Sequence, residues 1–424
     1  MASRRPPASR RARAPLRVEI LGTGDELVRG RSRDTNFGRI ASLLTDLGHE
    51  VVGGRIVGDD LGDLVEALRR AAGRADAVIM TGGLGPTADD LTRDAAARLL
   101  KVPLVEHGPS LRRIRGMWRR RGIPMPPSNA LQALHPRGSE ILPNLRGTAP
   151  GVRWKLLGAD VFCLPGPPRE MEPILVRSVI PALRRRAGGK SPTRTLYASC
   201  CGVSESAAAE RIADLMARDR PVKVGTTAAA AVITVSIHGT GEAASLVPAV
   251  HREVLRRMEE DAYAGERIPP GENLVRLLLE RKLTVSVAES CTAGLVAARL
   301  ADRPGSSGAL LGGVVAYSNE VKRKVLGVPS RLLRLHGAVS GPVAEAMAKG
   351  ARKLTGSDLA VAVTGVAGPD GGTARKPVGL VWFAVADRRG VRSVSRRFGG
   401  GRDFVRSAAA ATAIDLVRRA VQRA

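Results

Sequence analysis

Ser290 occupies the position in this sequence that is best suited to covalent chemistry. It follows a run of apolar residues, typical of a buried strand, that ends at Glu289, and an Ala- and Leu-rich helical stretch begins just after it. The free N–H groups at the start of a helix stabilise developing negative charge. The hydroxyl could therefore be a nucleophile or simply a helix cap, and on its own the position favours the cap.

Other polar residues of the C-terminal third follow predicted strands or lie in Gly-rich loops. They are Ser307, Tyr317, Lys322, His336, Thr364, Gly365, Gly368, Arg402 and Arg406. Ligands of open α/β sheets bind beyond the carboxyl ends of the strands, so these residues are candidates for one site. Each signal is weak alone. Lys322 could equally be a solvated surface residue, and the two Arg could be an exposed helix start.

A second candidate site lies in the N-terminal third, where a predicted strand runs into a Gly-rich turn at residues 81–87. The free N–H groups of such a loop can cradle phosphates. The loop residues that we expect to contact a ligand are Gly82, Gly83, Gly85 and Thr87. Four nearby acids, Asp59, Asp60, Asp89 and Asp90, could hold Mg²⁺ or Mn²⁺, or could instead cap helices.

The elements that would position the N-terminal site alternate along the chain. Predicted strands at residues 18–21, 50–57 and 77–80 are separated by predicted helices at residues 35–47 and 61–72. Strands that alternate with helices in this way predict a parallel sheet with helices on both faces.

Two breaks divide the rest of the sequence. Residues 185–195 are basic and rich in Gly, Ser and Pro, and Pro269-Pro270-Gly271 marks a second break. Between them we predict strands at 195–201 and 232–239 and helices at 204–217 and 243–260, and the last domain begins with a helix at 273–281 and a strand at 283–288. The predicted fold class is α/β, with two three-layer α/β/α domains joined by a small α+β domain. The predicted boundaries are 1–16 for a disordered basic arm, then 17–185, 193–267 and 270–424.

The composition is strongly basic. The 424 residues include 57 Arg and 10 Lys and carry a formal net charge of +27. This charge suggests either nucleic-acid binding or a solvated basic shell with sites for phosphorylated substrates. The basic residues are dispersed along the sequence and only 3% of residues are aromatic, so we favour the basic shell. The longest apolar runs are far shorter than the ~20 residues of a membrane helix.

The terminal arm and the cysteines point to a cytoplasmic protein. Residues 1–17 contain six Arg and no apolar segment of the kind found in signal peptides. The four Cys have none of the paired spacings of zinc sites, and we predict that they are small core residues in a reducing compartment.

The segments of the C-terminal third, taken together, resemble the CinA C-terminal family of nicotinamide mononucleotide (NMN) amidohydrolases. The matching segments are residues 288–292, 317–322, 336–340, 363–369 and 376–379, in order and with sensible spacing. The resemblance implies hydrolysis of the NMN carboxamide to a carboxylate and ammonia, without a cofactor. One residue departs from the family pattern: Ala293 stands where the family usually has the first of two glycines.

An amidase of this kind needs an activated hydroxyl, a base and a site for the oxyanion. We assign Ser290 as the nucleophile. No His–Asp pair suggests itself for His336, so a Ser–Lys arrangement with Lys322, helped by Tyr317, is the better hypothesis. Lys322 would need a lowered pKa. Candidates for the carboxamide and phosphate contacts are Thr364, Gly365, Gly368, Ser307, Arg402 and Arg406.

The N-terminal segments resemble the molybdopterin-binding-like domain of CinA proteins. They are residues 22–27, 34–36, 57–60, 81–90 and 164–171. In the family this domain is linked to ADP-ribose pyrophosphatase activity, which implies a divalent metal, Mg or Mn. Residues 128–132 lack the basic residue that the family often has between its Asn and Gln.

Three functional hypotheses remain open at this point. The first is an NMN deamidase with an N-terminal ADP-ribose pyrophosphatase, acting on small nucleotides in the cytoplasm as a homodimer. The second is a molybdopterin-type nucleotide-binding module that has lost its enzymatic activity. The third is a nucleic-acid partner, which the charge suggests and the dispersal of the basic residues disfavours.

Overall fold

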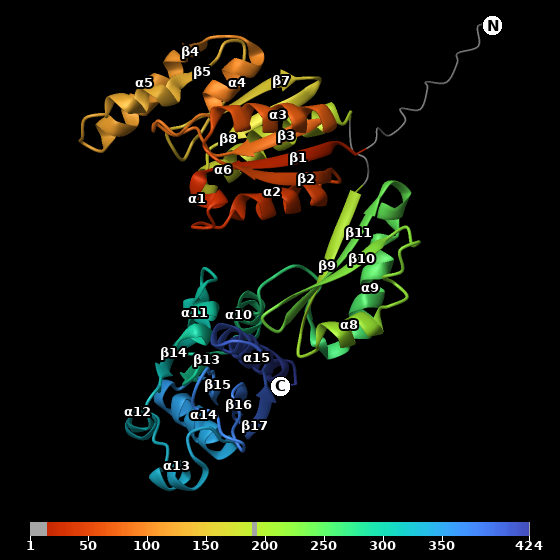
Figure 1. The fold of residues 1–424 in the computed structure, drawn as a ribbon. Helices are drawn as coiled ribbons and strands as arrows, with labels where there is room; N and C mark the ends of the chain where they lie inside the picture. Colours follow the sequence, from red (N-terminus) through yellow and green to blue (C-terminus); the bar gives the residue numbers. More distant parts are fainter. Residues whose placement is uncertain (1–14, 189–192, 424) are drawn as a thin grey trace, which may run out of the picture. The chain divides into compact units, whose positions relative to one another are not determined.

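A computed structural model describes residues 15–188 and 193–423 of the chain (Figure 1). The chain divides into two compact units, Met1–Arg194 with Thr240–Ala244 and Thr195–Gly239 with Ser245–Ala424. The structure confirms the α/β fold class, since several sheets are flanked by helices. The predicted basic arm lies outside the described residues except for Pro15 and Leu16. Leu16 is buried in the core of the first unit, so the folded region begins one residue earlier than expected.

The first unit is built on a six-stranded sheet. Its order is β2 (Glu50–Val57), β1 (Arg17–Thr23), β3 (Ala77–Thr81), β8 (Ala159–Leu164), β7 (Gly151–Leu156) and β6 (Glu140–Leu142). The first four strands run parallel, and the three of them that were predicted, β1, β2 and β3, are parallel as expected, whereas β7 and β6 pair antiparallel. A short turn joins β7 directly to β8 and leaves no room for a crossover helix, so the sheet is mixed rather than wholly parallel.

Helices cover both faces of this sheet because alternate strand residues point to opposite sides. Val78 and Met80 of β3 pack in one core with α3 (Leu61–Arg74) and α4 (Thr92–Leu100). Ala77 and Ile79 pack in the other core with α2 (Thr35–Asp46), α6 (Pro168–Ile174) and α7 (Ile180–Arg186). The remaining elements are α1 (Asp25–Val28), β4 (Leu104–Glu106), α5 (Gly108–Arg120), β5 (Leu134–Pro136), and the short η1 (Pro127–Ala133) and η2 (Leu175–Val179).

A four-stranded sheet follows, in the order β10 (Lys223–Ala229), β11 (Val232–Thr240), β9 (Thr193–Cys201) and β12 (Ala262–Ala264). It carries the helices α8 (Glu205–Arg211) and α9 (Val247–Met258) and the short helices η3 (Gly241–Ser245) and η4 (Glu259–Asp261). Both α8 and α9 are shorter than predicted; α9 starts late because Pro248 belongs in a first turn. The sequence did not predict β10, since its Gly, Thr and Ala residues lack an apolar alternation.

The C-terminal sheet has five strands, in the order β14 (Leu310–Val315), β13 (Val285–Glu289), β15 (Leu359–Gly365), β16 (Leu380–Asp387) and β17 (Gly390–Arg397). The first three strands are parallel to one another, whereas β16 pairs antiparallel with both β15 and β17. The helices are α10 (Pro270–Arg281), α11 (Leu295–Ala301), α12 (Asn319–Lys324), α13 (Ser330–His336), α14 (Gly341–Thr355) and α15 (Arg402–Gln422), with the short η5 (Ser306–Gly308). His336, expected in a loop, is the last residue of α13.

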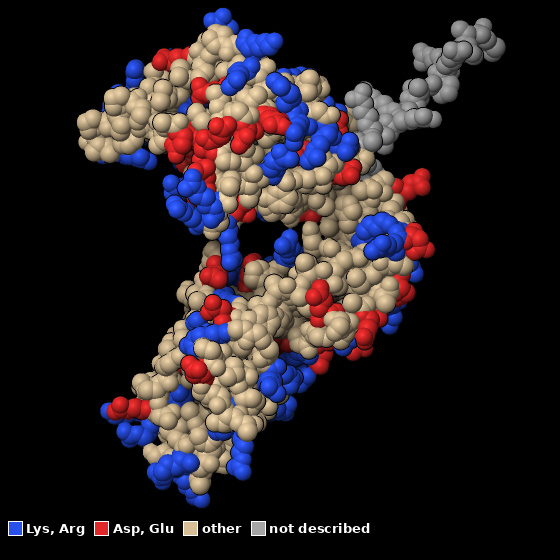
Figure 2. Space-filling model, viewed as in Figure 1, with Lys and Arg blue, Asp and Glu red and all other residues tan. Residues whose placement is uncertain are grey.

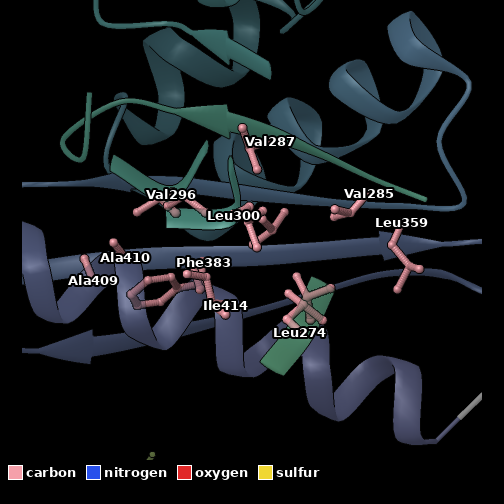
Figure 3. Close-up of a cluster of buried hydrophobic side chains, with 14 of the residues drawn as sticks. Leu274, Val285, Val287, Val296, Leu300, Leu359, Phe383, Ala409, Ala410 and Ile414 are labelled. Carbon is pink, nitrogen blue, oxygen red and sulfur yellow. The ribbon is translucent and has the colours of Figure 1, made fainter. Parts of the chain in front are cut away.

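The two faces of this sheet differ in side-chain size. Val285, Val287 and Phe383 point to the face covered by α10, α11 and α15, where they meet Leu274, Val296 and Ile414, among others (Figure 3). The opposite face, under α14, consists largely of alanines: Ala288, Ala360, Ala362, Ala384 and Ala386. Small side chains allow α14 to pack close to the strands.

The described helices include none with both the length and the hydropathy needed to cross a membrane. All four cysteines are buried and unpaired, as predicted.

Candidate active site in the C-terminal domain

Ser290 lies at the carboxyl end of the central strand β13. Its N–H donates to the carbonyl of Val363 in β15 at 2.9 Å, so the ladder fixes its backbone. Residues 291–294 form a turn, in which Ala293 has a φ of 50° and Gly294 a φ of 91°. Helix α11 begins only at Leu295, with Gly294 as its N-cap. Ser290 is therefore not the helix cap, which removes the structural alternative for its hydroxyl.

Glu289 takes the capping role instead. Its carboxylate is buried and accepts hydrogen bonds from the N–H groups of Gly294 at 2.9 Å, Val296 at 3.1 Å and Ala297 at 2.9 Å. An anion at a helix N-terminus is stabilised both by these bonds and by the helix dipole. Glu289 received no role from the sequence, although a carboxylate between an apolar strand and a helix was the available signal.

Lys322 approaches the serine from helix α12. Its Nζ lies 3.1 Å from Ser290 Oγ, and it donates to the carbonyl oxygens of Ala316 at 2.8 Å and Tyr317 at 3.3 Å. The Lys322 residue is only 1% exposed, whereas its helix neighbour Lys324 is exposed and pairs with Glu320. The alternative of a solvated surface lysine at position 322 is thus wrong.

The surroundings of Lys322 favour an unprotonated amine. Burial lowers the pKa of Lys322, and no carboxylate of the described residues forms an ion pair with it. A neutral amine has two N–H groups for the two carbonyl oxygens and one lone pair for the serine hydroxyl. The site can therefore take a proton from Ser290, which is the task of a general base.

Two arginines at the start of α15 border this site. Arg402 donates to the carbonyl oxygen of Gly368 at 2.8 Å and to the phenol oxygen of Tyr317 at 3.0 Å. Arg406 donates to the carbonyl oxygen of Thr292 at 3.2 Å, while its Nε is buried without a partner in the described structure. Cationic side chains that converge in this way can bind an anionic group of a substrate.

The structure does not bring every predicted residue to Ser290. The hydroxyl of Thr364 is buried and donates to the carbonyl oxygen of Ala338 at 2.9 Å, so it holds the loop before α14. The phenol of Tyr317 is exposed and bonded to Arg402. Ser307 lies in η5, just before the amino end of β14, whereas Ser290 follows the carboxyl end of the parallel neighbour β13. In this chain the two serines therefore lie at opposite ends of the sheet.

The predicted N-terminal loop lines a separate cavity of about 370 Å³ in the first unit. Its lining includes Thr23, Glu26, Asp59, Gly82, Gly83, Gly85, Thr87, Asp89, Asp90, Gln132, Thr148 and Glu170. Arg93, which was not among the residues predicted from the sequence, is buried and donates to the carbonyl oxygens of Leu84 at 2.6 Å and Gly85 at 2.8 Å. Acidic side chains gather on the surface of this unit between α1 and α3 (Figure 2).

The four predicted metal-binding acids have different environments. Asp60 caps α3 by accepting from the N–H groups of Gly62 and Asp63, and it does not line the cavity. Asp59 and Asp90 line the cavity, but both accept hydrogen bonds from backbone N–H groups. Among residues 15–188 and 193–423, no three His, Cys, Asp or Glu side chains form a group that could hold a metal ion. The donor set does not fit a protein-built metal site, and we propose no metal-dependent step.

Comparison with known families identifies matches along most of the chain. A model described as "CinA C-terminal domain" matches residues 269–421, one described as "Probable molybdopterin binding domain" matches residues 19–185, and one described as "Damage-inducible protein CinA KH domain" matches residues 193–264.

Relatives of similar length also match. The chain is 42% identical over 414 residues to a CinA-like protein of Geobacter sulfurreducens, covering 95% of this chain and 99% of the relative. It is 41% identical over 410 residues to a CinA-like protein of Anaeromyxobacter dehalogenans, covering 96% of this chain and 100% of the relative. A solved structure of a competence/damage inducible protein from Agrobacterium tumefaciens is 43% identical, covers 36% of this chain and 96% of its own, and has a TM-score of 0.35.

Proposed function

The chain belongs to the CinA family, and from that premise we propose that its C-terminal domain hydrolyses the carboxamide of nicotinamide mononucleotide. The observation that carries the proposal is the 3.1 Å approach of the buried Lys322 amine to the Ser290 hydroxyl, with no carboxylate paired to that amine in the described part of the chain. The products would be nicotinate mononucleotide and ammonia.

The first half of the proposed reaction forms an ester with Ser290. Lys322 takes the hydroxyl proton as Ser290 Oγ attacks the carboxamide carbon, and the carbonyl oxygen becomes an oxyanion. Lys322 then gives its proton to the amide nitrogen. The carbon–nitrogen bond breaks, ammonia leaves, and the nicotinoyl group remains bonded to Oγ.

The second half releases the acid. Lys322, neutral again, takes a proton from a water molecule that attacks the ester carbon. The carbon–Oγ bond breaks, and the proton on Lys322 returns to Ser290. Water thus supplies the oxygen of the new carboxylate, and the enzyme ends in its starting protonation state.

Arg402 and Arg406 are the proposed phosphate contacts. Both lie in the first turns of α15, and the unpartnered Nε of Arg406 is a donor that a phosphate oxygen could satisfy. A phosphate held there would orient the nicotinamide ring relative to Ser290, so binding energy from a remote group would assist the reaction.

The test is ammonia release from NMN by the full chain. We expect no release above background from Ser290→Ala and a rate about 10² to 10⁴ lower for Lys322→Met. Lys324→Met is the matched control, since Lys324 lies on the same helix but is exposed. Wild-type inactivity, or full activity of Ser290→Ala, would refute the proposal.

We also propose that the N-terminal cavity binds a nucleotide through its phosphates. Two observations support this. Residues 82–87 line the cavity, and the Arg93 side chain donates a hydrogen bond to the carbonyl oxygen of Leu84 and so stabilises this loop. Hydrolysis of ADP-ribose by this domain is the activity to assay. Release of AMP that persists in Ser290→Ala would assign hydrolysis to the N-terminal domain, and absence of release would count against it. Calorimetric titration with ADP-ribose measures the binding itself.

A further inference from the structure

Helix α5 gathers arginines on one face. At about 3.6 residues per turn, Leu111, Ile114 and Trp118 share the side of the helix that packs on the first unit. Arg112, Arg113, Arg115, Arg119 and Arg120 occupy the remaining surface of the helix and are all exposed. We call these five residues the arginine face. The prediction that the basic residues are dispersed is wrong for this helix.

No acidic side chain neutralises the arginine face among the residues that the structure describes. Helix α5 contains no acidic residue, and none of the ion pairs or hydrogen bonds in the described parts of the chain involves a side chain of this face. Other arginines of the protein behave differently: Arg256 and Arg257 of α9, for example, both pair with Glu253. Five uncompensated guanidinium groups on one helix create a local positive potential that attracts a polyanion.

The chemistry around the face distinguishes between polyanions. A membrane-surface helix inserts large apolar side chains, but the residue between the arginines on this face is Gly116. A single strand would stack its bases on aromatic rings, but Trp118 is half-buried and packs toward the core. The phosphates of a duplex lie on its outer surface, where guanidinium groups can bind them without any aromatic ring stacking on a base. The arginines of α5 therefore suit a duplex better than a single strand.

We propose that the arginine face of α5 binds the phosphate backbone of double-stranded nucleic acid without reading base sequence. From Arg112 to Arg120 the helix rises about 12 Å, enough to follow several phosphates of a duplex. This interaction is independent of amide hydrolysis and involves the other unit of the protein.

The experiment measures binding of the full chain to a labelled duplex DNA of about two helical turns by fluorescence anisotropy over a range of NaCl concentrations. The test variant is Arg112→Gln/Arg115→Gln/Arg119→Gln. The control is Arg323→Gln/Arg331→Gln/Arg334→Gln, which removes the same charge from exposed positions of the C-terminal domain. Circular dichroism and thermal unfolding verify that both variants are folded.

Each lost phosphate contact reduces the slope of log K against log salt by about 0.9, so the test variant should lose about 2.7. The control should keep the wild-type slope. Equal losses in both variants would show attraction to overall charge and overturn the proposal. Absence of duplex binding, or tighter binding to phosphatidylglycerol vesicles than to duplex at equal salt, would also overturn it.

Discussion

Replacement of Glu289 tests how the turn after β13 is held in place. The carboxylate accepts three hydrogen bonds from the start of α11 and is buried, so in Glu289→Ala these three N–H groups lose their acceptor inside the protein. In Glu289→Gln the amide oxygen can still accept, but the amide NH₂ faces a backbone N–H. We therefore expect stability to fall in the order Glu, Gln, Ala.

The expected loss of stability can be estimated from the three hydrogen bonds that the Glu289 carboxylate accepts. Hydrogen bonds to a charged group contribute about 1.5–3 kcal/mol each, and they are not additive within one cluster. We expect a loss of about 2–3 kcal/mol for Glu289→Gln and about 3–5 kcal/mol for Glu289→Ala. For a domain of this size, each kcal/mol of lost stability lowers the unfolding temperature by about 2–4 °C. The alanine variant should therefore unfold at a temperature roughly 6–20 °C lower than the wild type.

The assay combines thermal unfolding with amide hydrogen exchange. Exchange should accelerate at Gly294, Val296 and Ala297, the three N–H groups that lose their acceptor. Glu320→Ala is the control, because an exposed ion pair contributes at most about 1 kcal/mol. If Glu289→Ala unfolds at the same temperature as Glu320→Ala, and if hydrogen exchange at these three amides is unchanged, the capping role of Glu289 is refuted.

Four further predictions follow from other parts of the molecule. Because burial lowers the pKa of Lys322, kcat/KM for NMN should rise with pH through a midpoint below the ordinary lysine value of about 10.4, as a pH–rate profile would show. Ala293→Gly should stabilise by about 0.5–1 kcal/mol in thermal unfolding, since a φ of 50° strains alanine. Burial lowers the pKa of His49, so the unfolded chain protonates first and stability should fall as pH drops below about 6.5; His49→Phe should remove this dependence in urea titrations. Gly350→Ala should destabilise by about 1–3 kcal/mol in the same titrations despite its better helix propensity, because the new Cβ would lie 2.0 Å from the carbonyl oxygen of Leu326.

Much of the fold could be predicted because its signals are local. The strands β1, β2 and β3 and the helices α2 and α3 follow the apolar patterns of their own residues. The antiparallel strands β6 and β7 could not be placed, since their pairing depends on the turn into β8 and on contacts distant in sequence. Strand β10 is ordered by its hairpin with β11 rather than by its own composition.

The candidate site was partly predictable for the same reason. Ser290 was proposed from its residue type and its place after a predicted strand, and Lys322 was proposed as its base after the family resemblance was considered, but their separation depends on where α12 packs. The role of Glu289 required the true start of α11 at Leu295, which lies beyond the turn that follows the strand. Ser307 was grouped with the site although its loop precedes β14 and therefore lies at the amino end of that parallel strand.

The unequal faces of the C-terminal sheet imply opposite responses to mutation. On the side of Val285, Val287 and Phe383, replacing a side chain by a smaller one leaves a cavity and lowers stability. Replacing it by a larger one lowers stability less where a large neighbouring side chain can change its conformation. On the alanine side there is almost no volume to remove, so the damaging changes are those that add atoms and force α14 outward. Random substitution of this domain should therefore show two layers of positions on opposite faces of one sheet. One layer should tolerate smaller side chains poorly, and the other should tolerate larger side chains poorly.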